Sequence, residues 1–151
     1  MKYSYTYESI IGKLTITESD SKIISIDFGE SAEPQENRKE TPLIKEARKQ
    51  LEEYFKGTRK SFQLPIELRG TPFQQKVWNA LLSIPYGKTV SYKQIAEAVG
   101  NPKACRAVGM ANNKNPIPII VPCHRVIGAN GKLVGYGGGL EIKEKLLELE
   151  Q

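Results

Sequence analysis

Thiol and imidazole groups are scarce in this sequence. Its 151 residues include two cysteines, Cys105 and Cys123, and one histidine, His124. Two cysteines cannot form a disulfide framework. Together with a single imidazole they also cannot form a Cys/His zinc site without carboxylate ligands. We therefore expect no structural metal and reduced thiols.

Long apolar runs are absent as well. No run approaches the roughly 20 residues of a membrane-spanning helix. The opening sequence, MKYSYTYESI, lacks the apolar stretch of a secretory signal. Hydrophobic residues make up 39% and charged residues 26% of the chain, which excludes a disordered or fibrous protein. We expect a cytoplasmic protein without a membrane partner.

Acidic residues are almost missing from one part of the chain. Residues 1–70 carry 12 basic and 12 acidic side chains, whereas residues 71–140 carry eight basic side chains and one acidic, Glu97. A net charge of +7 over that stretch is typical of a protein with a polyanion partner, most simply nucleic acid. A basic face that is merely solvated remains the alternative at this point.

The N-terminal part predicts a small sheet and one helix. Alternating, β-rich segments at residues 2–8, 12–18 and 23–28 are typical of an antiparallel meander. After a polar loop, Thr41 and Pro42 have the residue types of an N-cap and a first helical position, so a helix is expected from there to Gly57.

The C-terminal part predicts mainly helices. Capping-box patterns open two of them, over residues 71–82 and 91–99. Asn101-Pro102 would cap a third, over residues 103–111. The last two helices meet at Gly100, which gives them the outline of a helix-turn-helix.

The expected fold class is therefore α+β. Residues 1–70 would form a supporting domain of antiparallel sheet and helix. Residues 71–151 would form a helical, winged-helix-like domain that binds DNA and carries the reactive cysteine.

One short segment gathers the reactive side chains. Three prolines stiffen residues 115–122, and Cys123, His124 and Arg125 follow directly. A thiol becomes a nucleophile as its thiolate, which a nearby cation or histidine favours. Adjacent side chains point in different directions, so we expect a water to link Cys123 with His124 and a carboxylate to orient the imidazole. An inert, buried Cys123 is the alternative, although it leaves the neighbouring histidine and arginine unexplained.

The segment Pro122-Cys123-His124-Arg125-Val126 resembles the active-site motif of the O6-alkylguanine-DNA alkyltransferases, also called methylated-DNA–protein-cysteine methyltransferases. Further matching segments lie in the same order and spacing within residues 71–150: Ser91-Tyr92, Ile95-Ala96, Asn101-Pro102, Arg106-Ala107-Val108-Gly109, Asn115-Pro116, Gly135-Tyr136 and Gly138-Gly139. Residues 1–70 resemble the family's N-terminal domain less specifically.

The resemblance implies DNA repair by direct transfer of an alkyl group from O6-alkylguanine in double-stranded DNA to Cys123, after the damaged nucleotide is flipped out. The thioether product is stable, and the sequence has neither a motif for a resolving thiol nor a cofactor fingerprint. We therefore expect a monomeric, single-turnover methyltransferase without a cofactor.

The resemblance also implies catalytic roles for individual residues. Cys123 would accept the alkyl group, His124 would be the water-linked base, and Glu150 would orient His124. Tyr92 would donate a proton to the leaving guanine.

A second set of residues is implied to bind the damaged base. Asn115 would tie the active-site turn together, and the Val126 carbonyl and Tyr136 would line the guanine pocket. Gly137 stands where some members of the family have a serine, so only its backbone N–H could reach guanine.

A third set is implied to contact DNA. Arg106 matches the finger that enters the minor groove and fills the space left by the flipped nucleotide. The other expected DNA contacts are Tyr92, Lys93, Asn101, Lys103 and Arg125.

Two other functions compete with alkyl transfer. The first is a non-catalytic helix-turn-helix protein that binds DNA and has a structural Cys123. The second is a cysteine hydrolase of small acyl compounds, which would require an oxyanion hole that no motif indicates.

Overall fold

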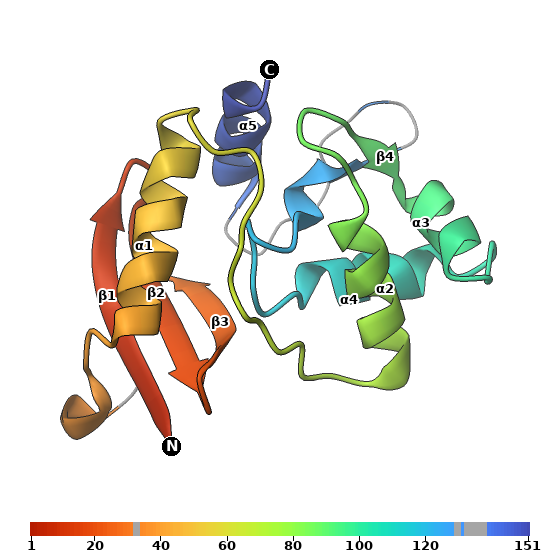
Figure 1. The fold of residues 1–151 in the computed structure, drawn as a ribbon. Coiled ribbons are helices and arrows are strands. Elements are labelled where there is room, and N and C mark those ends of the chain that lie inside the picture. The colour runs from red at the N-terminus through yellow and green to blue at the C-terminus, as the bar shows by residue number, and fades with distance from the viewer. Residues whose placement is uncertain (32–33, 129–130, 132–138) are drawn as a thin grey trace. The chain divides into compact units, whose positions relative to one another are not determined.

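An antiparallel sheet with consecutive neighbours opens the chain (Figure 1). β1 (Lys2–Ser9) pairs with β2 (Gly12–Ser19), and β2 pairs with β3 (Lys22–Phe28), with a register irregularity between Thr17 and Glu18. The meander expected from the sequence is confirmed, because alternating residues and short turns are local signals that suffice to fix it.

One helix packs on this sheet. α1 (Pro42–Phe55) begins where its N-cap, Thr41, accepts a hydrogen bond from the Ile44 backbone N–H at 3.2 Å. A 3₁₀ turn, η1 (Gln35–Asn37), precedes it. Apolar residues from the strands and the helix fill the space between them, namely Leu14, Ile16, Ile23, Ile26, Ile44, Ala47, Leu51 and Tyr54.

Four helices and two short strands are the regular elements in the described residues after position 68. The helices are α2 (Pro72–Leu82), α3 (Tyr92–Ala98), α4 (Cys105–Asn113) and α5 (Leu140–Leu149). β4 (Val90–Ser91) and β5 (Val126–Ile127) pair in parallel. A 3₁₀ turn, η2 (Cys123–Arg125), immediately precedes β5.

α2, α3 and α4 pack against one another around a common core. The indole N–H of Trp78 on α2 donates to the Ala111 carbonyl on α4 at 2.8 Å, and Val108 and Ile95 are buried beside them. Because α4 is fixed in this way along its buried side, its opposite side is held at the surface.

The third expected helix begins later than the sequence predicts. Ala104 donates its backbone N–H to the Asn101 carbonyl at 3.0 Å, so these residues form a turn, and α4 begins at Cys105 without a side-chain cap. Asn101 therefore does not act as the N-cap of this helix, and the helix continues to Asn113, two residues further than expected.

The structure describes residues 1–31, 34–128, 131 and 139–151. The chain divides into two compact units, Met1–Leu68 and Arg69–Gln151, a boundary two residues before the one expected from the sequence.

Among the described residues, each helix is too short or too polar to cross a membrane.

The capping box of α3 supports a stability prediction. Ser91 accepts a hydrogen bond from the Gln94 backbone N–H at 3.1 Å, and the Ser91 N–H donates to the Gln94 side chain at 2.8 Å. We expect Ser91→Ala to lower the free energy of unfolding by about 1 kcal/mol and Ser91→Asp, which can still cap, to lower it less. Denaturant unfolding followed by the fluorescence of Trp78, the single tryptophan, measures both. Equal stability of the alanine variant and the parent would contradict the prediction.

Candidate active site

A buried turn presents the reactive thiol. Residues 117–126 leave α4 and run through the core, with Ile117, Ile119 and Val121 at most 1% exposed. Ile119 has a φ of 76°, a conformation that is strained for a β-branched residue and that persists only where the surroundings enforce it. Cys123, the first residue of η2, is 3% exposed.

The side chain of Asn115 closes this turn on itself. Its amide group donates to the Val121 carbonyl at 2.8 Å, and its carbonyl oxygen accepts from the Ile117 N–H at 3.0 Å. Both bonds are to backbone, so Asn115 fixes the path of the chain that leads to Cys123.

Glu150 joins the end of α5 to the same turn. One carboxylate oxygen, Oε2, lies 2.6 Å from His124 Nε2, and both side chains are nearly inaccessible to solvent. Arg125 donates to the carboxylate twice, from Nε to Oε1 at 2.8 Å and from Nη2 to Oε2 at 3.0 Å. The Gly87 N–H lies 3.3 Å from Oε1. The carboxylate thus holds both residues that follow Cys123.

Arg125 was expected to contact DNA, and the structure contradicts that expectation. Its side chain is buried, and besides its two bonds to Glu150 it donates from Nη1 to the Ile84 carbonyl at 2.8 Å. A guanidinium held by this many internal partners cannot reach a phosphate without losing them. Arg125 is a positioning residue for Glu150.

The surroundings of His124 favour its neutral form. Burial lowers the pKa of His124 below its ordinary value, the Glu150 carboxylate opposes this, and the charges of Arg125 and Lys143 add to the lowering. In a neutral imidazole the nitrogen that faces a carboxylate carries the proton. Nε2 therefore donates to Glu150, and Nδ1 carries the lone pair that a base needs.

Tyr92 stands at the start of α3, close enough to Cys123 for their charges to interact. Burial raises the pKa of Tyr92, the charge of Cys123 raises it further, and a hydrogen bond from the Asn112 side chain lowers it. The phenol is therefore protonated at neutral pH and available as a proton donor.

Two residues of the site were missed by sequence reasoning. Lys143 on α5 is fully buried and donates to the Val126 carbonyl at 2.6 Å. Burial lowers the pKa of Lys143, and the charge of Cys123 raises it. Asn112 on α4 is 1% exposed and donates to the Cys123 carbonyl at 3.3 Å. A lysine on an acidic helix and an asparagine in a polar run carry no local signal of burial.

The four remaining residues expected to contact DNA are accessible. Lys93, Asn101, Lys103 and Arg106 are all exposed. Arg106 lies in the first turn of α4, on the side opposite Val108 and Ala111, where a partner can reach it. Tyr136 and Gly137, expected in the guanine pocket, lie outside the described residues.

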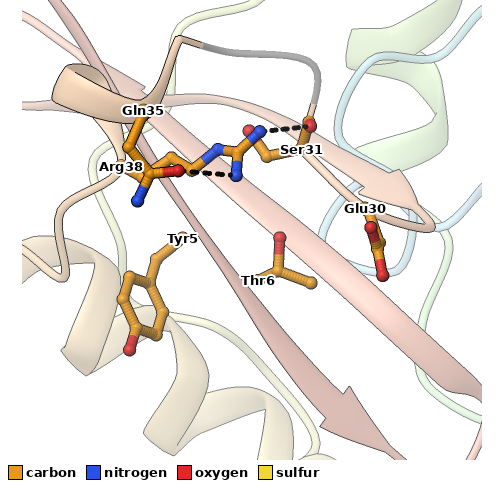
Figure 2. Close-up of a pocket in the computed structure, with 6 residues that line it drawn as sticks. All are labelled: Tyr5, Thr6, Glu30, Ser31, Gln35 and Arg38. Carbon is orange, nitrogen blue, oxygen red and sulfur yellow. Dashed lines mark hydrogen bonds between the residues drawn. The ribbon is translucent and has the colours of Figure 1, made fainter.

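A polar hollow in the N-terminal unit contains none of these residues. Its volume is about 320 Å³, and the Arg38 guanidinium on its wall donates to the Gln35 side chain and the Ser31 carbonyl (Figure 2). The residues that line it are Tyr5, Thr6, Glu30, Ser31, Gln35 and Arg38. Among the described residues, no cluster of three or more His, Cys, Asp or Glu side chains is placed to hold a metal ion.

α4 has the exposed Arg106 at its beginning, and Asn112 near its end contacts a buried thiol turn. Together with the exposed Lys93 and Lys103, this arrangement is typical of a DNA-binding class of protein with a cysteine at its reactive centre. Two family models match the chain: "6-O-methylguanine DNA methyltransferase, DNA binding domain" over residues 72–151, and "6-O-methylguanine DNA methyltransferase, ribonuclease-like domain" over residues 1–68. Together they span nearly every residue. The chain belongs to the 6-O-methylguanine DNA methyltransferase family.

Two curated relatives are similar over nearly their whole length. A constitutive methylated-DNA–protein-cysteine methyltransferase of Bacillus subtilis is 51% identical over 160 residues, covering 100% of this chain and 96% of that protein. A methylated-DNA–protein-cysteine methyltransferase of Methanosarcina acetivorans is 50% identical, covering 98% of this chain and 97% of that protein.

A solved structure agrees with the fold. The crystal structure of Mycobacterium tuberculosis OGT in complex with DNA superposes with a TM-score of 0.91 at 49% identity, covering 98% of this chain and 92% of that one. The expected α+β class is therefore confirmed, both by the elements themselves and by this similarity.

The neutral state of His124 generates a pH prediction. Because its pKa is lower in the folded chain than the ordinary 6.5, the unfolded chain binds more protons as the pH falls. The stability that His124 contributes is complete above about pH 6.5 and declines as the pH falls from there through the folded pKa, by at most about 1.4 kcal/mol per pH unit.

Unfolding of the C-terminal unit, followed by Trp78 fluorescence between about pH 7 and pH 5, measures this slope. His124 is the single histidine, so His124→Asn should remove this contribution. Parallel pH profiles of the parent and the variant would contradict the prediction.

Proposed function

We propose that this protein repairs DNA by transferring the alkyl group of O6-alkylguanine to the sulfur of Cys123, once per molecule. The observation that carries the proposal is the placement of the Cys123 turn. It lies between a His124–Glu150 pair and the Tyr92 phenol, inside the unit that matches the family's DNA-binding domain.

The reaction is a displacement at saturated carbon. The Cys123 sulfur forms a bond to the alkyl carbon while the bond between that carbon and guanine O6 breaks, and the electron pair leaves with guanine. The thiol proton passes through a water to His124 Nδ1, and the Tyr92 phenol gives a proton to the departing guanine. His124 then releases its proton to solvent and Tyr92 regains one from solvent, so the net change is the transfer of the thiol proton to guanine. The products are S-alkylcysteine and guanine, so no redox partner or cofactor is required.

Single turnover follows from the chemistry of the product. A thioether is not released by water or by a second thiol. The other cysteine, Cys105, is exposed at the start of α4, whereas Cys123 is buried. An S-alkylated Cys123 therefore stays alkylated.

Burial of the thiol requires the substrate to leave the duplex. Cys123 is 3% exposed, and a base within the helical stack cannot bring its O6 substituent to such a group. Eversion costs a few kcal/mol, part of which Arg106 offsets by occupying the space in the stack. Lys93, Asn101 and Lys103 bind phosphates around it.

The everted base lies against the active-site turn. The Val126 carbonyl, held by Lys143, is a fixed acceptor on this turn. Tyr136 and Gly137 complete the guanine pocket in this proposal. The protein acts in the cytoplasm as a monomer on double-stranded DNA.

Intact-mass measurement after incubation with an O6-methylguanine duplex tests the proposal. We expect the mass to rise by one CH₂ unit per chain and to stay unchanged in Cys123→Ala, because the sulfur is the acceptor. DNA binding without a gain in mass would instead favour the non-catalytic helix-turn-helix protein. Sustained turnover of an ester would favour the hydrolase.

The finger role of Arg106 has its own test. We expect Arg106→Ala to slow repair of the duplex by roughly tenfold or more, because the gap in the stack is left empty, and to leave the reaction with free O6-benzylguanine nearly unchanged. Rates of alkylation measured on both substrates give the comparison. Equal losses on the two substrates would remove Arg106 from this role.

A further inference from the structure

The function proposed above leaves one buried polar side chain of the site unused. Asn112 is on the inner side of α4, 1% exposed, where Val108 and Ala111 would predict an apolar neighbour. Its amide group donates to the Cys123 carbonyl and also to the Tyr92 phenol, so it bridges the acceptor turn and the proton donor.

The other half of this amide is unsatisfied. The carbonyl oxygen, Oδ1, is buried and accepts no hydrogen bond from any described residue. Buried acceptors are almost always paired, because an unmade hydrogen bond costs free energy. An unpaired acceptor on a side chain that is itself bonded to the Cys123 carbonyl is therefore suited to a donor that arrives with the substrate.

The chemistry of O6-alkylguanine identifies that donor. Alkylation at O6 removes the proton from N1, and N9 is bonded to the sugar, so the 2-amino group carries the base's only N–H bonds. The same group is the donor that distinguishes guanine in the minor groove. An acceptor in the pocket can therefore recognise guanine only through its 2-amino group.

We propose that Asn112 is a specificity-determining residue of the pocket, whose Oδ1 accepts a hydrogen bond from the 2-amino group of the everted base. Its amide N–H bonds keep Oδ1 in place, because both of their acceptors, on Tyr92 and Cys123, belong to the site itself. The inference rests on the proposed function.

The test compares two lesions in the same duplex, O6-methylguanine and O6-methylhypoxanthine, which lacks the 2-amino group. We expect the parent protein to alkylate Cys123 faster with the first lesion and the ratio of the two rate constants to fall roughly tenfold in Asn112→Leu, which removes the acceptor at similar volume. Because both lesions share one duplex context, changes in DNA affinity cancel in the ratio.

Two further variants keep the test decisive. Asn112→Asp retains an oxygen acceptor and should preserve the ratio even if it reacts more slowly with both lesions, which also covers the case in which Asn112→Leu does not fold. Asn113→Leu makes the same change at the exposed neighbour and should give the parental ratio.

The outcomes separate the two proposals. If the parent alkylates Cys123 and the ratio is the same in Asn112→Leu, or if Asn112→Asp loses the preference for guanine, the role of Asn112 is overturned while the repair function stands. If the parent gains no alkyl group from either lesion, the proposed function itself fails.

Discussion

The arrangement of the active site depends on one carboxylate. Glu150, directly after α5, is held by His124 and Arg125 of the active-site turn and lies beside the Gly87 N–H that follows α2. These segments are far apart in sequence, and the carboxylate is the point at which they meet. Because the groups are buried, removing it would leave the Arg125 guanidinium without a counter-charge, a loss of about 3–5 kcal/mol where such pairs have been broken.

Burial is the first reason that a histidine beside a carboxylate stays neutral. The Glu150 carboxylate favours the protonated form of His124, but it already carries two hydrogen bonds from Arg125, and the charges of Arg125 and Lys143 add to the effect of burial. The second buried cation, Lys143, interacts instead with the charge of Cys123. His124 is thus kept unprotonated, the state that a base in the proposed reaction needs.

Local signals in the sequence predicted the fold well, and the long-range contacts of the site less well. The meander and the capped helices follow from patterns a few residues long, which is why their positions agree to within one or two residues. The start of α4 was misplaced because a proline-containing turn imitates a cap. Arg125 was expected to contact DNA from the resemblance, and only Glu150, 25 residues away, reveals that it is internal. Lys143 and Asn112 were missed for the same reason, since their burial depends on contacts with η2 and β5.

α4 connects the two halves of the proposed mechanism. Arg106 lies at its exposed beginning and Asn112 at its buried end, six residues apart, or about 9 Å along the axis of a rigid helix. The hydrogen bond from Trp78 to Ala111 anchors the helix between them, so neither end can shift without disturbing the core. In the proposed mechanism Arg106 replaces the base in the stack and Asn112 receives that base. The helix thereby keeps these two side chains at a fixed separation.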